Sequence, residues 1–277
     1  MTLKIDAHHH LWQFNHRDYG WMSPEMTVLR RDFLVPELQA SLRANGIGGT
    51  VAVQARQTVE ETRWLLGLRR QTALISGVVG WVPLADPDLR RYLDEFAGDP
   101  GLKGVRHVLH DEPDDLYMLR EDFNRGISLL RDYALVYDLL VFERHLPQTI
   151  AFVDRHPNQL FVLDHIAKPR IRERSLSPWR EGVLELAKRE NVRCKLSGMV
   201  TEADWGVWTY PDLEPYIDVV LEAFGPRRLM FGSDWPVLLL AATYQAWLGA
   251  VSRKLDTLSA DEQDWIWRGT ASAAYRL

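Results

Sequence analysis

The feature that most constrains the fold is a regular alternation of short apolar segments with longer segments of helical periodicity. Eight runs rich in apolar or β-branched residues recur along the chain, and helical spacing follows each of them. These runs cover residues 4–10, 49–54, 76–81, 103–107, 134–140, 160–164, 192–196 and 229–232. Strict strand and helix alternation predicts parallel strands. Eight parallel strands that close into a cylinder form a (β/α)₈ TIM-type barrel, which has its active site at the C-terminal ends of the strands.

The segments between these runs predict the helices that would surround such a barrel. They cover residues 35–44, 58–71, 88–97, 121–131, 146–156, 179–189, 213–224, 244–251 and 260–267. The 277 residues contain no low-complexity linker, and α/β barrels commonly need about 250 residues, so we expect a single domain over residues 1–277. An open doubly wound sheet is the alternative fold, but no glycine fingerprint for a dinucleotide follows the first run.

Charge and hydropathy exclude several classes of partner. The chain carries 33 basic and 38 acidic residues, a net charge of −5, and so offers no broad cationic field for nucleic acid. No apolar run approaches the roughly 20 residues of a membrane span, and the N-terminal stretch is too short for a signal peptide. We therefore expect a cytoplasmic protein without a membrane partner. The lone Cys194 is expected to be a buried strand residue, and assembly into a homo-oligomer is left open.

The sharpest motif is a run of three histidines at the end of the first predicted strand. Side chains alternate along a strand, so His8 and His10 should share one face and His9 the other. Imidazoles that point into a barrel are costly to bury unless they bind a metal, a water or a ligand. We therefore expect His8 and His10 to belong to a functional site.

Two later strand ends supply complementary groups. Asp234 follows the last predicted strand, which lies beside the first when the barrel closes, so its carboxylate should face His8 and His10. His165 follows the sixth predicted strand and should reach the same mouth. A carboxylate near several imidazoles can take a proton from water while nearby donors stabilise an oxyanion.

Five motifs together resemble the amidohydrolase superfamily, and within it the branch that hydrolyses lactones. They span residues 6–12, 104–107, 163–169, 194–198 and 232–236 and cover essentially the whole chain. The resemblance implies hydrolysis of a sugar-acid lactone, with Asp234 as general base and His8, His10 and His165 in the same site. Arg106 and His107, at the end of the fourth strand, are candidates for polarising the carbonyl.

The resemblance also implies limits on the metal. Two-metal members of the superfamily use a bridging modified lysine or a carboxylate in mid-barrel, and neither Arg106-His107 nor Tyr137-Asp138 supplies that lysine. At most one divalent ion is therefore expected. Its candidate ligands are His8, His10, His165 and Asp234. Zinc is the natural partner of three histidines and an aspartate, and metal-independent catalysis stays open.

Residues at other strand ends and in long loops are candidates for binding the lactone. They are Trp12, Trp21, Gln54, Arg56, Trp81, Ser197 and Trp235. Aromatic rings can stack on the apolar face of a sugar, and amides and hydroxyls suit its hydroxyl groups. Asp138 and Lys195 are expected to pair with each other. With Lys195 paired in this way, few cationic side chains are left near the predicted mouth to bind carboxylates. This favours a neutral sugar lactone over a dicarboxylate as the substrate.

Two other functions remain as alternatives. A barrel decarboxylase of a small unsaturated acid would use zinc and the same histidine and aspartate positions. A catalytically inactive barrel could bind a sugar acid without transforming it, but such a protein has no need of a base opposite an oxyanion site.

Overall fold

The computed structural model describes residues 3–277, and within them eight parallel strands form one sheet in the order of the chain. The strands are β1 (Lys4–His9), β2 (Ile47–Val53), β3 (Ile75–Gly80), β4 (Leu102–Val108), β5 (Val136–Leu140), β6 (Phe161–Leu163), β7 (Val192–Leu196) and β8 (Leu229–Phe231). The first two residues, part of the stretch in which no signal peptide is expected, lie outside the described residues. Each predicted strand is present, with ends that differ by a few residues.

The sheet closes between its last and first strands. The Asp234 backbone N–H donates to the His8 carbonyl at 2.8 Å, and the His10 N–H donates to the Trp235 carbonyl at 2.6 Å. The buried Asp6 carboxylate reinforces this seam, because it accepts bonds from the N–H and the hydroxyl of Ser233. The predicted barrel is therefore confirmed, and the open-sheet alternative is wrong.

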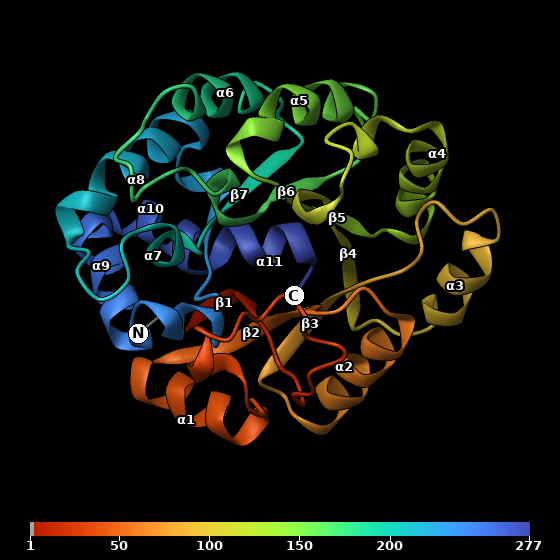
Figure 1. The fold of residues 1–277 in the computed structure, drawn as a ribbon, viewed down its shortest axis with the longest axis horizontal. Helices are drawn as coiled ribbons and strands as arrows, with labels where there is room; N and C mark the ends of the chain where they lie inside the picture. Colours follow the sequence, from red (N-terminus) through yellow and green to blue (C-terminus); the bar gives the residue numbers. More distant parts are fainter. Residues whose placement is uncertain (1–2) are drawn as a thin grey trace.

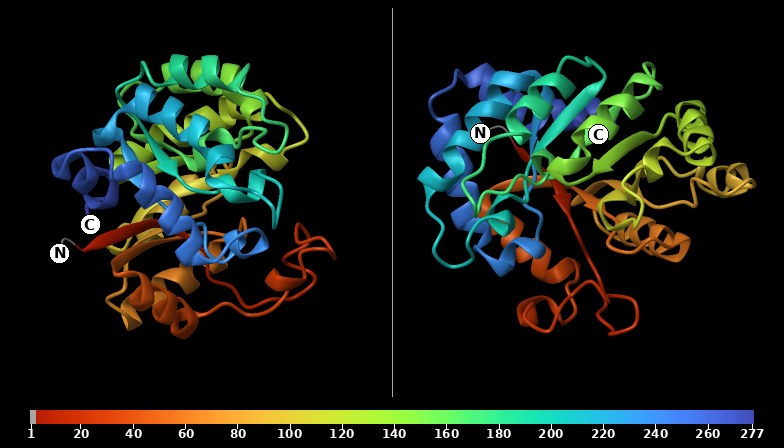
Figure 2. Two further views of the ribbon diagram at one scale, coloured as in Figure 1. Left: turned by 90° about the vertical axis from the view of Figure 1, so that its left-hand side faces the viewer. Right: turned by 45° about the horizontal axis from the view of Figure 1, so that its top comes forward.

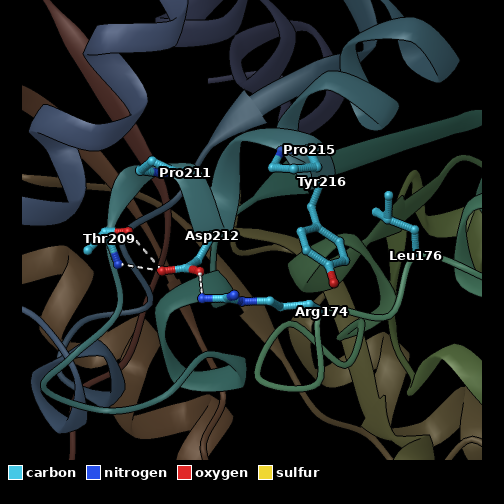
Figure 3. Close-up of a pocket in the computed structure, with 7 residues that line it drawn as sticks. All are labelled: Arg174, Leu176, Thr209, Pro211, Asp212, Pro215 and Tyr216. Atoms are coloured by element: carbon cyan, nitrogen blue, oxygen red, sulfur yellow. Dashed lines mark hydrogen bonds and ion pairs between the residues drawn. The ribbon is translucent and has the colours of Figure 1, made fainter.

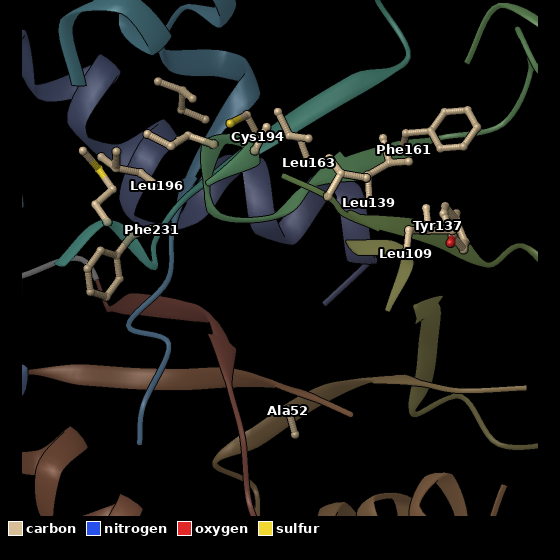
Figure 4. Packing of buried hydrophobic residues seen from close by; sticks show 14 of the residues in the cluster. Ala52, Leu109, Tyr137, Leu139, Phe161, Leu163, Cys194, Leu196 and Phe231 are labelled. Carbon is tan, nitrogen blue, oxygen red and sulfur yellow. The ribbon is translucent and has the colours of Figure 1, made fainter. Parts of the chain in front are cut away.

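Helices form a ring outside the strands (Figure 1). The α-helices of residues 3–277 are α1 (Val35–Asn45), α2 (Val59–Gln71), α3 (Leu89–Phe96), α4 (Glu121–Leu130), α5 (Leu146–Asp154), α6 (Trp179–Leu186), α7 (Met199–Glu202), α8 (Tyr210–Phe224), α9 (Tyr244–Leu255), α10 (Ala260–Asp264) and α11 (Thr270–Tyr275), of which α7 and α11 do not belong to this ring. Buried side chains of β6, β7 and β8 form part of the core and include Cys194, which is buried as expected (Figure 4).

The last helix fills the barrel from the end opposite the site. Ala271, Ala274 and Tyr275 of α11 pack in one buried cluster with side chains of the strands, among them Val79 and Val162. Figure 1 shows α11 within the ring of strands. This apolar layer supports the polar layer that lies nearer the C-terminal ends of the strands.

Two boundaries differ from the sequence prediction for physical reasons. Helix α8 begins at Tyr210 rather than 213, because Pro211 lies in its first turn, where the missing N–H is not needed. Thr209 and Asp212 cap this end reciprocally. Strand β5 begins at Val136 rather than 134, since Ala134 has a positive φ of 55° and cannot continue a strand.

Two long loops extend beyond the C-terminal ends of the strands. The segment between β1 and α1 projects from the barrel before it returns (Figure 2), and an antiparallel bridge between Trp12 and Phe33 fixes its base. The loop between β7 and α8 contains the short helix α7. Among residues 3–277, none of the helices combines the length and the apolar character that crossing a membrane requires.

Candidate active site

A cavity of about 380 Å³ lies at the C-terminal ends of the strands, where the fold places its predicted catalytic groups. Its polar lining includes His10, Arg106, His165 and Asp234 from the strand ends and Lys168 and Glu202 from the loops. Trp21 and Trp205, from the two long loops, are each 40% exposed and also line it. The cavity therefore combines convergent polar groups with flat aromatic surfaces.

Three imidazoles surround the carboxylate of Asp234. Its Oδ1 lies 3.3 Å from His10 Nε2, 3.8 Å from His8 Nε2 and 3.9 Å from His165 Nε2. His9 points elsewhere and bonds Thr50 through Nε2 at 3.0 Å, as alternation along the strand predicts. The structure thus brings together the four residues expected at this site: His8, His10, His165 and Asp234.

Asp234 is held as an anion in a buried position. Burial alone would raise the pKa of its carboxyl, but the nearby His165, His10 and Lys168 outweigh that effect, and the net pKa is below the usual value. Its backbone has a φ of 59°, a conformation that L-residues adopt at some cost and that recurs at functional sites. The carboxylate is therefore ionised at neutral pH and able to accept a proton.

The donor set fits a single cation. His10 Nδ1 lies 2.8 Å from the Val53 carbonyl, which places the proton on Nδ1 and the lone pair on Nε2. The Nε2 atoms of His8 and His10 are only 3.2 Å apart, and the Asp234 carboxylate lies beside both. His10 Nε2 is thus an acceptor facing His8 Nε2, and either a proton on His8 or a cation between the two atoms accounts for their closeness. Two imidazoles and a carboxylate are ligands that zinc prefers.

His165 owes its position to the two residues that follow β7. Its Nδ1 lies 2.9 Å from the Ser197 hydroxyl, so Ser197 orients the ring instead of lining the cavity. Gly198 follows with a φ of 63°, and a Cβ built on it would lie 2.5 Å from His165 Nδ1. A glycine is therefore required beside this imidazole, for both its conformation and its small size.

Gly198→Ala is expected to lower kcat/KM at least about 10-fold, because misplacement of a catalytic group by about 1 Å can cost 10²-fold. Gly46→Ala is the matched control, since Gly46 has a similar φ of 68° but nothing within 4 Å of its would-be Cβ. Steady-state kinetics of both folded variants make the comparison. Equal, small effects of the two substitutions would show that the contact with His165 is unimportant.

Buried charges behind the cavity wall hold Arg106. Its Nη1 lies 3.0 Å from Asp164 Oδ2, and its Nη2 donates to the Gln54 carbonyl at 2.5 Å. Lys195 Nζ lies 3.0 Å from Asp164 and 2.5 Å from Asp138. The expected pairing of Asp138 with Lys195 is therefore confirmed. Every charge in this cluster has a partner of opposite sign, as burial demands.

Several predicted site residues do not reach the cavity, and packing explains why. His107 bonds Glu112 at 2.6 Å and stacks on Tyr117, while the Trp81 indole donates to His107 at 3.3 Å. Among the other candidates, Arg56 pairs with Asp18 at 2.6 Å. The predicted site residues absent from the lining are His8, which lies buried behind it, and Trp12, Gln54, Arg56, Trp81, His107, Ser197 and Trp235.

Two of these tryptophans, Trp12 and Trp235, are packed inside the protein. Trp12 and Trp235 are almost fully buried and meet the two sides of Phe33 in edge-to-face contacts. The Trp12 indole also donates to the Arg31 carbonyl at 2.9 Å. They pack the base of the first loop and hold no free surface for a ligand. Trp21 is the predicted aromatic residue that does line the cavity.

The sequence reasoning missed polar residues of the lining that come from loops. Lys168 and Glu202 form an ion pair of 2.7 Å, and His110 and Asp111 lie on another part of the wall. Lys168 precedes a proline outside the strand, which suggested a position away from the site. The signal that could have revealed it is its place three residues after His165, in the same motif.

A second pocket, of about 310 Å³, lies beside α8 and is less suited to catalysis (Figure 3). Asp212 there accepts bonds from Thr209 and from Arg174, and the Tyr216 hydroxyl donates to the Ser175 carbonyl. Its polar side chains are thus engaged with one another or with backbone. The cavity at the strand ends is the better candidate.

Known proteins match the chain along its whole length. The family model described as Amidohydrolase matches residues 5–277. The chain belongs to the amidohydrolase family. This confirms the superfamily and the lactonase branch that the motifs indicated.

Two relatives and one solved structure are similar to this amidohydrolase over its full length. An L-fucono-1,5-lactonase from Burkholderia multivorans is 44% identical over 287 residues, covering 100% of this chain and 97% of the relative. One from Burkholderia ambifaria is 38% identical with the same coverage. The crystal structure of a Burkholderia multivorans amidohydrolase with bound zinc has a TM-score of 0.96 at 44% identity and covers both chains fully.

Proposed function

We propose that this amidohydrolase opens the ring ester of a sugar-acid lactone, with L-fucono-1,5-lactone as the leading substrate. The observation that carries the proposal is the Asp234 carboxylate, ionised and within 3.9 Å of three imidazoles at a cavity. The 44% identity to an L-fucono-1,5-lactonase supports the choice of substrate. A carboxylate base beside donors for an oxyanion suits ester hydrolysis.

In the proposed reaction Asp234 takes a proton from water while the water oxygen bonds to the lactone carbonyl carbon. Charge develops on the carbonyl oxygen, where Arg106 and His165 are placed to stabilise it. The bond between the carbonyl carbon and the ring oxygen then breaks, and Asp234 returns its proton to that oxygen. The product carboxylic acid ionises at neutral pH and releases one proton per lactone.

Arg106 suits this role because its charge is permanent and its position is fixed. The guanidinium cannot be neutralised at working pH, and Asp164 and the Gln54 carbonyl hold it in place. Pre-set donors of this kind stabilise an oxyanion without reorganisation and contribute about 10²–10³ in rate. His107, which faces Glu112, is not included in the proposed set.

His8, His10 and Asp234 would hold one divalent ion. Such an ion would polarise the ester carbonyl and lower the pKa of a bound water. A second group of donors, His8, Asp164 and His165, shares His8 with the first, and its Asp164 already pairs with two cations. The geometry therefore supports one ion rather than two.

Zinc titration is expected to reach no more than one equivalent per chain, and His10→Asn should weaken that binding because it removes one of three ligands. Elemental analysis and calorimetric titration of the apoprotein measure this without an activity assay. His156→Asn is a control outside the site, since His156 bonds Asn124. Two tightly bound equivalents would contradict the proposed single centre. Measuring activity after the metal has been removed with a chelator then shows whether polarisation of the ester carbonyl depends on the metal.

A panel of 1,4- and 1,5-aldonolactones, assayed by proton release, tests the proposed function. We expect hydrolysis of at least one sugar lactone with kcat/KM above about 10⁴ M⁻¹s⁻¹. Carbon dioxide evolution from an unsaturated acid, without proton release from any lactone, would instead indicate a decarboxylase. Tight binding of sugar acids without turnover of any lactone would indicate a binding barrel.

A further inference from the structure

The chain between β6 and Pro169 contains a strained turn. Four consecutive residues, His165 to Lys168, have positive φ values between 47° and 63° although none is glycine. Left-handed backbone costs an L-residue roughly 1–2 kcal/mol. The Lys168 N–H bonds the His165 carbonyl at 2.8 Å, and the Trp179 indole donates to the Ile166 carbonyl at 2.6 Å.

This turn brings two side chains to the cavity. His165 reaches Asp234, and Lys168, three residues later, also lines the wall. Backbone strain of this kind persists only where the surroundings impose it, and it clusters at ligand and active sites. His165 has a role in the proposed reaction, whereas Lys168 has so far been assigned only a contribution to the low pKa of Asp234.

Lys168 pairs with a residue of the neighbouring loop, the one that follows β7. Its Nζ lies 2.7 Å from Oε1 of Glu202, the last residue of α7, and the two side chains are only 16% and 22% exposed. The Glu202 carbonyl is fixed by the Arg172 N–H at 2.9 Å. Within residues 3–277, each of the two charged groups has the other as its sole side-chain hydrogen-bond partner.

The pair, which lines the cavity, has hydrogen-bonding capacity that it does not use internally. An ammonium has three donors and a carboxylate about four acceptor sites, and one of each is used within the pair. Their charges cancel, so the pair does not attract a charged group. Trp205, whose indole donates to the Thr201 carbonyl at 2.9 Å, adds a fixed aromatic ring on the same loop.

We propose that Lys168 and Glu202 bind adjacent ring hydroxyls of the substrate, the lysine as donor and the glutamate as acceptor. The proposal rests on the sugar-lactone function proposed above and deepens it, because it assigns the residues that select a polyhydroxylated ring. A pair that only joined the two loops would contribute little, since partly exposed ion pairs are worth about 0–1 kcal/mol. Hydrogen bonds to charged groups contribute more, about 1.5–3 kcal/mol.

The test compares L-fucono-1,5-lactone with δ-valerolactone, which has the same six-membered ester ring and no hydroxyls. Glu202→Gln and Lys168→Met should each lower kcat/KM for the sugar lactone about 10- to 100-fold, the range that loss of a charged hydrogen bond gives. For δ-valerolactone the change should be under about 3-fold. The dissociation constant of the product L-fuconate should rise with the loss in kcat/KM, which provides a readout if δ-valerolactone is turned over too slowly.

Lys254→Met is the matched control, because Lys254 is 19% exposed and pairs with Asp218 on the outer helices. It should leave both substrates unchanged. Equal losses on both lactones, or none on either with unaltered L-fuconate binding, would overturn the hydroxyl assignment. Wild-type protein that opens no sugar lactone would instead overturn the proposed function itself. If Lys168→Met does not fold, the comparison of the two lactones is made with the near-isosteric Glu202→Gln alone.

Discussion

Asp234→Asn is expected to lower kcat for lactone hydrolysis by at least about 10² while the protein stays folded. General-base catalysis contributes about 10²–10⁴ in rate, and the amide of asparagine cannot accept the proton. Three imidazoles lie within 3.9 Å of the carboxylate, but burial lowers the pKa of His8 and His165, and the Val53 carbonyl fixes the orientation of His10, so none of them replaces the carboxylate directly.

The substitution is suited to a clean comparison. Asparagine has nearly the same shape as aspartate, and the backbone bond from residue 234 to the His8 carbonyl is retained. Asp212→Asn in the second pocket is the control, since that carboxylate is remote from the proposed chemistry. Rates are measured by proton release, and folding by circular dichroism. Near-normal turnover by a folded Asp234→Asn protein would remove Asp234 from the mechanism.

Neutral sugar lactones are expected to be preferred over pyrone-type dicarboxylates by at least about 10² in kcat/KM. The charged residues of the lining are two cations, Arg106 and Lys168, and three acids, Asp111, Glu202 and Asp234. Lys168 forms an ion pair with Glu202, and Arg106 forms one with Asp164. A second substrate carboxylate would therefore lose its water without gaining a free cation, and like charges at such an interface cost several kcal/mol.

Parallel assays of L-fucono-1,5-lactone and 2-pyrone-4,6-dicarboxylate at one pH and salt concentration measure this preference. A preference for the dicarboxylate would mean that Arg106 and Lys168 act as a carboxylate clamp. It would also weaken the assignment of ring hydroxyls to the Lys168 and Glu202 pair. Arg56, a lactone-binding candidate from the sequence, pairs with Asp18 and is absent from the lining, so it would not belong to such a clamp.

The fold and the centre of the site were predictable because they depend on regular geometry. Alternating strands and helices define the order of the sheet, and parallel strands place all their C-terminal ends on one side. His8, His10, His165 and Asp234 lie at or just beyond the C-terminal ends of strands, so the positions of the strands determine where these residues meet. The contact between His10 and Asp234 at 3.3 Å, between opposite ends of the chain, is an example.

Residues outside the regular elements were not predictable in the same way. Whether a tryptophan packs or faces a cavity depends on how its loop folds, and Trp12 and Trp21 lie in one loop with opposite outcomes. Lys168 reaches the cavity through four residues of left-handed backbone, which no propensity of Ile166 or Ala167 indicates. His107 precedes a strand end but turns to Glu112, a partner on a short segment whose course the sequence pattern does not define.

Hydrolysis of L-fucono-1,5-lactone in water enriched with ¹⁸O tests the central claim, that this cavity directs water to a lactone carbonyl. The account predicts one proton released and one ¹⁸O atom in the product carboxylate for each lactone opened, with no carbon dioxide and with a rate that falls at least about 10²-fold in Asp234→Asn. Label at the C5 hydroxyl of the opened product, carbon dioxide as a product, or wild-type rates that do not exceed those of Asp234→Asn would contradict it.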